Sequence, residues 1–206
     1  MPLPVQIGLV VMSVHDGHLQ VLVRRDSSGW RLPGERVDSA DDLDACARHA
    51  VRACVARDDL FVEQLYTFGG ADSGARNCAI TVCYYAVRPW HAEAGLQAAL
   101  QWRAMADVLP LPASDRAIID RAYERLQAKL SYSTLAFHFL PEEFTLTDVQ
   151  TVHEIILGET LDKRNFRKRI LAQNFVTDAG ACRRDGSHRP ARLYRYTQPG
   201  EIRYLK

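Results

Sequence analysis

The chain has 206 residues, of which 47% are hydrophobic and 25% are charged, and its formal net charge is +1. This composition is typical of a folded protein and excludes a largely disordered chain, while the length leaves room for one or two domains and excludes large barrels. No apolar run approaches the roughly 20 residues that a membrane helix needs, and the N-terminus does not resemble a signal peptide.

The first half of the chain begins with strand patterns and continues into a helix. Two apolar runs flank an Asp-Gly dipeptide at 16–17, which is typical of the tight turn in a β-hairpin. Residues 30–34 are expected to form a strand or turn end. Over 43–55 the apolar residues recur with helical spacing, and Ser39 is the expected N-cap of this helix.

A second group of strands follows this helix. Three β-rich segments lie at 61–68, 77–87 and 101–105. The glycine-rich segment 69–74 is expected to be a loop, and Ser114 is expected to cap a helix over 115–130 that has one apolar face. Residues 1–130 are therefore predicted to form a layer of mixed strands with two helices.

The charge balance changes along the chain. Residues 1–130 carry 14 Lys and Arg against 16 Asp and Glu, whereas residues 160–206 carry 12 against 4. A balanced body with a cationic end indicates an anionic partner for that end, and nucleic acid is the first candidate. We place the domain boundary near 131–134, which gives one domain at 1–130 and a second at 131–206.

The cationic end is predicted to be a winged helix-turn-helix. Thr145 and Asp148 form a capping signal in front of an apolar helical stripe, and Asp162 can cap a second helix. Two short strands follow near 175–177 and 192–196, and a basic loop joins them. A helix, a tight turn, a cationic helix and a basic hairpin in this order are typical of that motif.

The cations of the second helix, predicted over 163–173, lie on the side away from its apolar residues. Arg and Asn can address base edges, while cations and helix N–H groups contact phosphates. A solvated face is the ordinary alternative, but the basic hairpin that follows favours double-stranded DNA over that alternative, and RNA is disfavoured because no stacking platform is present. The predicted DNA-binding residues are Lys163, Arg164, Asn165, Arg167, Lys168, Arg183, Arg184, Arg189 and Arg192.

The segment 32–37, Leu-Pro-Gly-Glu-Arg-Val, resembles the start of a Nudix box. The family pattern is a glycine, a glutamate six positions on, and then an Arg-Glu and a Glu-Glu pair on one helix, where the glutamates hold Mg²⁺ or Mn²⁺ beside a pyrophosphate. These positions are occupied here by Glu35, Asp41, His49, Ala50, Ala53 and Cys54. The comparison predicts a binding domain with no catalytic residues and no metal site. A metal site built from Asp41, Asp42 and Asp44 is a less favoured alternative, because a helix cap and dipole explain these residues.

Five further segments are similar to Nudix-related transcriptional regulators: 63–69, 131–137, 140–146, 161–167 and 189–194. This resemblance implies an α/β (α+β) fold, in which a Nudix-like α/β/α sandwich is followed by a small winged helix-turn-helix. It also implies a homodimer that binds palindromic operators. Many members of this family control NAD metabolism genes and respond to ADP-ribose, others control sugar catabolism, and some keep hydrolase activity.

A phosphorylated nucleotide bound without metal requires cations to offset its charge. Arginines near strand ends or loops can supply them, and Phe68 or Trp30 can stack on a base. The ordinary alternative is that the aromatic residues pack in the core and the arginines are solvated. The predicted effector-binding residues are Arg24, Arg36, Phe68 and Arg76, and no cofactor is expected.

Three functions remain open at this point. The favoured one is a ligand-responsive DNA-binding repressor. The second is a nucleotide pyrophosphatase with an accessory DNA-binding domain, and the third is a DNA-binding protein whose first domain serves dimerisation alone. The five cysteines form no Cys-x-x-Cys pair, which favours reduced thiols and a cytoplasmic protein over a disulfide framework.

Overall fold

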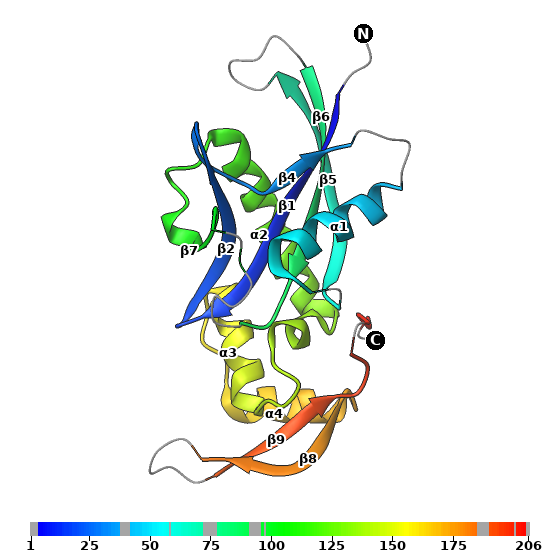
Figure 1. The fold of residues 1–206 in the computed structure, drawn as a ribbon. Helices are drawn as coiled ribbons and strands as arrows, with labels where there is room; N and C mark the ends of the chain where they lie inside the picture. The colour runs from blue at the N-terminus through cyan, green and yellow to red at the C-terminus, as the bar shows by residue number, and fades with distance from the viewer. Residues whose placement is uncertain are drawn as a thin grey trace.

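The computed structural model describes residues 4–37, 42–57, 59–71, 78–90, 96, 98–184, 190–199 and 201–204. A twisted sheet carries a helix on each face, and a smaller helical part with a β-hairpin lies at one end of this sheet (Figure 1). Within the described residues, no helix is long and apolar enough to cross a membrane.

The large sheet contains strands β1 (Val5–His15), β2 (His18–Asp26), β3 (Gly29–Arg31), β4 (Gly34–Arg36), β5 (Phe61–Ala71), β6 (Cys78–Val87) and β7 (Leu100–Ala104). Its main order is β3-β2-β1-β6-β5, with β4 paired to β1 and β7 paired to β2. Strands β1 and β6 run parallel, and the other pairs are antiparallel. The hairpin predicted at 16–17 is confirmed, with positive φ at both Asp16 (47°) and Gly17 (75°), as a type I′ turn requires.

Helices α1 (Leu43–Val55) and α2 (Ala113–Tyr132) cover opposite faces of this sheet, and a short 3₁₀ helix, η1 (Met105–Asp107), precedes α2. Side chains alternate along β1, so Leu9 packs in the core with α1, whereas Val10 packs in the core with α2. Because β1 has apolar residues on both faces, each face of the sheet is covered by a helix.

Three local predictions were wrong. The N-cap of α1 is Asp42, whose side chain accepts from the Asp44 N–H at 3.2 Å, and Ser39 lies outside the described residues. Helix α2 begins at Ala113 behind Pro112 without a side-chain cap, because the hydroxyl of Ser114 faces Asp115 instead. Residues 69–71 continue β5 rather than opening a loop, because their pairing with β6 is maintained through the glycines.

The C-terminal part contains η2 (Leu135–Phe139), α3 (Leu146–Leu157), α4 (Lys163–Ala172), β8 (Val176–Arg183) and β9 (Ala191–Tyr196). The capping box of α3 is confirmed: Asp148 N–H donates to Thr145 Oγ1 at 3.1 Å, and Thr145 N–H donates to Asp148 Oδ2 at 2.7 Å. Asp162 caps α4 as predicted. Strand β8 is longer than predicted, so Arg183 ends a strand and does not lie in the loop.

One apolar core joins the two parts of the molecule. It contains Val10 from the sheet, Leu126 from α2, Val149 from α3 and Phe166 from α4. The boundary predicted between residues 130 and 131 falls in the last turn of α2, and the division into 1–130 and 131–206 stays a prediction.

Candidate effector cleft and nucleic-acid interface

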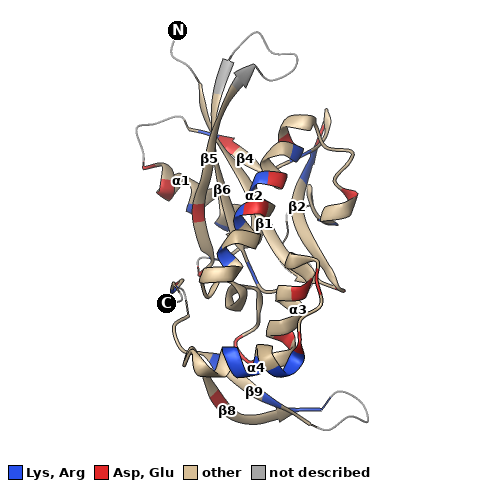
Figure 2. Ribbon diagram, turned by 180° about the vertical axis from the view of Figure 1, so that it is seen from behind, with Lys and Arg blue, Asp and Glu red and all other residues tan. Residues whose placement is uncertain are grey.

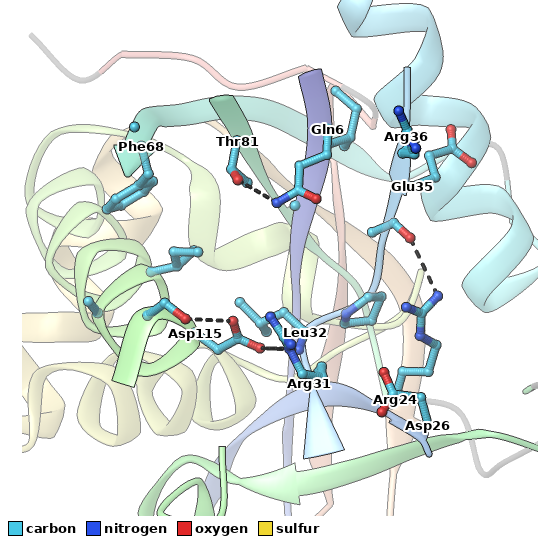
Figure 3. A pocket seen from close by; sticks show the side chains of 18 residues that line it. Gln6, Arg24, Asp26, Arg31, Leu32, Glu35, Arg36, Phe68, Thr81 and Asp115 are labelled. Carbon is cyan, nitrogen blue, oxygen red and sulfur yellow. Dashed lines mark hydrogen bonds and ion pairs between the residues drawn. The ribbon is translucent and has the colours of Figure 1, made fainter. Parts of the chain in front are cut away.

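A cleft of about 590 Å³ lies between the strands of the sheet and the first turns of α2 (Figure 3). Its polar lining comes from several strands and from α2: Gln6, Arg24, Asp26, Arg31, Glu35, Arg36, Thr81, Ser114 and Asp115. Phe68 and Ile118 contribute apolar surface. A concave site of this size with convergent polar groups suits a small-molecule ligand.

Gly34 permits the close approach that forms one wall of the cleft. A Cβ atom at this position would lie 2.3 Å from the carbonyl oxygen of Ile7, a distance at which atoms collide. Without a side chain at Gly34, β4 can pair with β1 and present Glu35 and Arg36 next to the cleft. The glycine of the Leu-Pro-Gly segment therefore has a steric role in this structure.

The structure brings together three of the four residues predicted to bind an effector. Arg24, Arg36 and Phe68 all line the cleft, whereas Arg76 lies outside the described residues. Arg24 Nη1 donates to the Gly34 carbonyl at 3.4 Å, and its Nε is buried without a hydrogen-bond partner among the described residues. A buried donor without a partner is costly, and an anionic ligand would satisfy it.

Sequence reasoning missed Arg31, which also lines the cleft. Arg31 lies opposite Arg24 in the pairing of β2 with β3. The turn residues between these strands are the sequence signal that could have predicted this pairing. Sequence reasoning also missed Gln6 and Thr81, whose side chains are hydrogen bonded at 2.7 Å. These two residues belong to different strands, so their contact depends on the pairing of β1 with β6.

The aromatic residues have different surroundings. Phe68 lines the cleft, with its ring centroid 5.3 Å from that of Tyr66. Trp30 does not line the cleft. The guanidinium carbons of Arg103 and Arg25 lie over its ring, 4.5 and 5.5 Å from the ring centroid. Of the two predicted stacking residues, Phe68 therefore lines the cleft and Trp30 does not.

The aspartates at the start of α1 have partners within the protein, and Cys54 is largely buried. Asp44 accepts a hydrogen bond from the hydroxyl of Tyr84 at 2.6 Å, and Asp42 caps α1. Burial raises the pKa of the Cys54 thiol to about 11. Within the described ranges, no three His, Cys, Asp or Glu side chains are grouped as a metal site would require, and Asp41 lies outside those ranges.

The second candidate region is the exposed side of α4. Phe166 and Ile170 are buried against the core, which leaves the predicted polar residues of this helix in solvent (Figure 2). We call four of them, Lys163, Arg164, Arg167 and Lys168, the α4 cation face. All four and Asn165 are exposed, and no carboxylate within the described part of the chain forms an ion pair with the cation face.

The predicted cations of the β8–β9 hairpin are arranged differently. Arg183 donates to both carboxylate oxygens of Asp148, at 2.8 and 3.0 Å. Arg192 donates to Asp178 at 2.8 Å. Arg184 is exposed, and Arg189 lies outside the described residues. Carboxylates of this molecule therefore engage two of the predicted DNA-binding arginines.

The chain is similar to known proteins both in its C-terminal part and over most of its length. Residues 136–196 match the family model of the NrtR DNA-binding winged helix domain. Over 202 residues, the chain is 31% identical to the ADPR responsive transcriptional repressor NtrR of Acinetobacter baylyi, a match that spans 92% of this chain and 80% of that protein. The chain belongs to the NrtR family of transcriptional regulators.

Solved structures of this family show the same architecture. NrtR of Shewanella oneidensis, crystallised with a 27mer DNA, matches with a TM-score of 0.84 and 31% identity, over 94% of this chain and 93% of that one. Its Nudix domain, crystallised with ADP ribose, matches with a TM-score of 0.52 and 29% identity, over 61% of this chain and 90% of that one. A MutT/nudix family protein of Enterococcus faecalis, 19% identical with a TM-score of 0.71, shares the fold. The predicted fold class, a Nudix-like domain followed by a winged helix, is confirmed.

Proposed function

We propose that this protein is a ligand-responsive transcriptional repressor, which binds double-stranded DNA through α4 and binds ADP-ribose or a related nucleotide in the cleft. The observation that carries this proposal is the α4 cation face, an exposed set of cations on the second helix of a helix-turn-helix. Such a helix enters the major groove in proteins of this architecture. A role on DNA assigns the protein to the cytoplasm.

One chain presents one such helix, which can contact one half-site. A homodimer with twofold symmetry presents two, and it would bind an operator with matching palindromic symmetry. Half-sites separated by one helical turn of DNA, or by a multiple of it, fit this arrangement. We infer that the functional unit is such a dimer.

ADP-ribose suits the chemistry of the cleft. Its two phosphates require cations, which Arg24, Arg31 and Arg36 can supply, and its adenine can stack on Phe68. Because cleavage of NAD at its nicotinamide bond produces ADP-ribose, a repressor that binds it would report NAD consumption. Genes of NAD metabolism are therefore the proposed targets. The relative from Acinetobacter baylyi, which is named as ADPR responsive, supports this choice.

We further propose that the cleft binds its ligand without hydrolysing it. Of the box positions that hold glutamates in Nudix hydrolases, the first is Asp41, and the three on α1 are Ala50, Ala53 and Cys54. Neither an alanine nor a thiol supplies the oxygen ligands that Mg²⁺ requires. The residue chemistry at these positions supports the proposed absence of enzymatic activity.

Four measurements test these proposals. Binding to operator DNA should weaken about 10³-fold between 50 and 200 mM salt if about six phosphates are contacted. ADP-ribose should bind in the presence of EDTA, as measured by calorimetry, and Arg24→Ala should weaken this binding at least about tenfold.

Rapid turnover of ADP-ribose with Mg²⁺ or Mn²⁺ that is lost in Asp44→Ala would instead establish the pyrophosphatase. If no nucleotide or sugar stabilises the protein against heat, the first domain serves dimerisation alone.

A further inference from the structure

Helix α2 extends from the cleft to the DNA-binding part. Asp115 and Ile118, in its first two turns, line the cleft. Tyr123 and Gln127, further along, contact the end of α3. At 1.5 Å per residue, the 20 residues of this helix span about 30 Å. One helix therefore contacts both the cleft and α3, the helix that precedes α4.

Asp115 places a negative charge inside a cleft that is proposed to receive an anionic ligand. Its side chain is buried, and its Oδ2 accepts from the Leu32 N–H at 2.8 Å and lies 3.5 Å from Arg31 Nε. Arg31 lines the same cleft. A phosphate that reaches Arg31 meets the Asp115 carboxylate, and two negative charges at this range repel with little screening by salt. The phosphate and Asp115 thus compete for one guanidinium group.

The other end of α2 holds α3 through one carbonyl group. Tyr123 Oη donates to the Ile156 carbonyl at 2.8 Å, and Gln127 Nε2 donates to the same oxygen at 3.0 Å. Carbonyls in the last turn of a helix have no N–H partner within that helix, so these side chains fix the end of α3 to α2. Ile156 is also buried in the core that contains Leu126 of α2. A shift of α2 would therefore be transmitted to α3.

The turn between α3 and α4 is itself held by side chains. Glu154 Oε1 accepts from the Leu161 N–H at 2.9 Å and from Gln150 Nε2 at 2.9 Å. Gln150 Nε2 also donates to the Leu161 carbonyl at 3.0 Å. These bonds connect α3 to the residue before the Asp162 cap. A shift of α3 would therefore reorient the α4 cation face.

We propose that α2 couples the cleft to α4. An anionic ligand displaces Asp115 from Arg31, the first turn of α2 shifts, and the bonds of Tyr123 and Gln127 carry this shift to α3 and α4. The inference rests on the function proposed above, because it requires both ADP-ribose and DNA to bind. The coupling is reciprocal, so DNA changes the affinity for ADP-ribose by the same factor by which ADP-ribose changes the affinity for DNA.

The double variant Tyr123→Phe, Gln127→Met removes both donors and keeps side chains of similar size. Its affinities for DNA alone and for ADP-ribose alone should stay within about threefold of wild type, because neither residue lies in either site. The factor by which saturating ADP-ribose changes DNA affinity should fall from about tenfold or more to nearly one. Fluorescence anisotropy of a labelled operator measures the DNA affinity and this factor, and calorimetry measures the affinity for ADP-ribose alone. Glu124→Gln, on the exposed side of the same helix, is the matched control and should keep the full factor.

Asp115→Asn is a second, independent variant. It keeps an acceptor for the Leu32 N–H and removes the charge, so ADP-ribose should bind roughly threefold to tenfold more tightly while the coupling factor falls. An unchanged coupling factor in the double variant, or wild-type protein that binds both ligands independently, overturns this inference. Failure of wild-type protein to bind ADP-ribose at all contradicts the proposed effector instead.

Discussion

Helix α4 and the β8–β9 hairpin are both rich in cations, but the surroundings of these cations differ. The α4 cation face is exposed and has no carboxylate partner in the described part of the chain. On the hairpin, Arg183 is bound by Asp148 and Arg192 by Asp178. A count of cations in a sequence therefore overestimates how many are free to meet phosphates. The variants and conditions below test this difference between helix and hairpin.

The largest effect is expected on α4 itself. Arg167→Ala with Lys168→Ala should weaken binding to a random-sequence duplex roughly 100-fold, because two phosphate contacts are lost. The slope of log affinity against log salt concentration should decrease in magnitude by about two. Arg192→Ala, a single change on the hairpin, should cost no more than about threefold, because Asp178 already pairs with that charge. Equal losses in the two proteins, measured by anisotropy, would remove the distinction between helix and hairpin.

The packing beneath α4 should be sensitive to acid. His153 is buried on α3 with its ring centroid 5.0 Å from that of Phe166, and burial lowers its pKa to about 4. Because this value lies below that of an unfolded histidine, about 6.5, the unfolded state binds more protons between these values. The contribution of neutral His153 to the free energy of unfolding is fully present above pH 6.5. It decreases as the pH falls toward 4, by at most about 1.4 kcal/mol per pH unit.

Urea unfolding between pH 7.5 and 4.5 measures this dependence. His153→Gln should show a shallower fall in the free energy of unfolding than wild type. Burial also lowers the pKa of His138, which contributes equally to both proteins and cancels in the comparison. Two parallel curves would show that protonation of His153 is not responsible.

A smaller effect is expected where the hairpin meets α3. Burial by itself raises the pKa of Asp148, but the hydrogen bonds from Arg183 and Thr145 outweigh it, and the net shift is downward. Asp148→Asn should therefore destabilise the protein by about 1–2 kcal/mol in urea unfolding at pH 7, since it weakens a helix cap and a bidentate pair together. Asp178→Asn breaks an exposed pair, and its cost should stay below about 0.5 kcal/mol.

The smallest effect concerns DNA binding by the hairpin. Asp178→Asn removes a negative charge and leaves Arg192 without its carboxylate. We expect DNA affinity to rise by about twofold to threefold at low salt, an increase that disappears at high salt. A decrease in affinity would mean that the ion pair positions Arg192 for DNA and does not compete with it.

Local signals in the sequence predicted most of the elements. The apolar spacing over 43–55, the dipeptide at 16–17 and the pair Thr145 and Asp148 act within a few residues of each other, and the structure confirms each of them. Errors arose where several residues could make the same cap, as at Ser39 and Asp42. Strand ends were also misjudged, because pairing with a neighbouring strand can extend a strand beyond its own pattern, as in β5.

The sequence by itself determined the helix faces, the hairpin turn and the cationic end, since each of these depends on residue type and short spacing. The tertiary structure decided which charges meet. Arg31 reaches Asp115 and Arg183 reaches Asp148 across long stretches of chain, and Gln6 meets Thr81 because β1 pairs with β6. Electrostatic contacts act through space at a few ångströms, so only the folded arrangement shows which cations keep their charge available for a ligand.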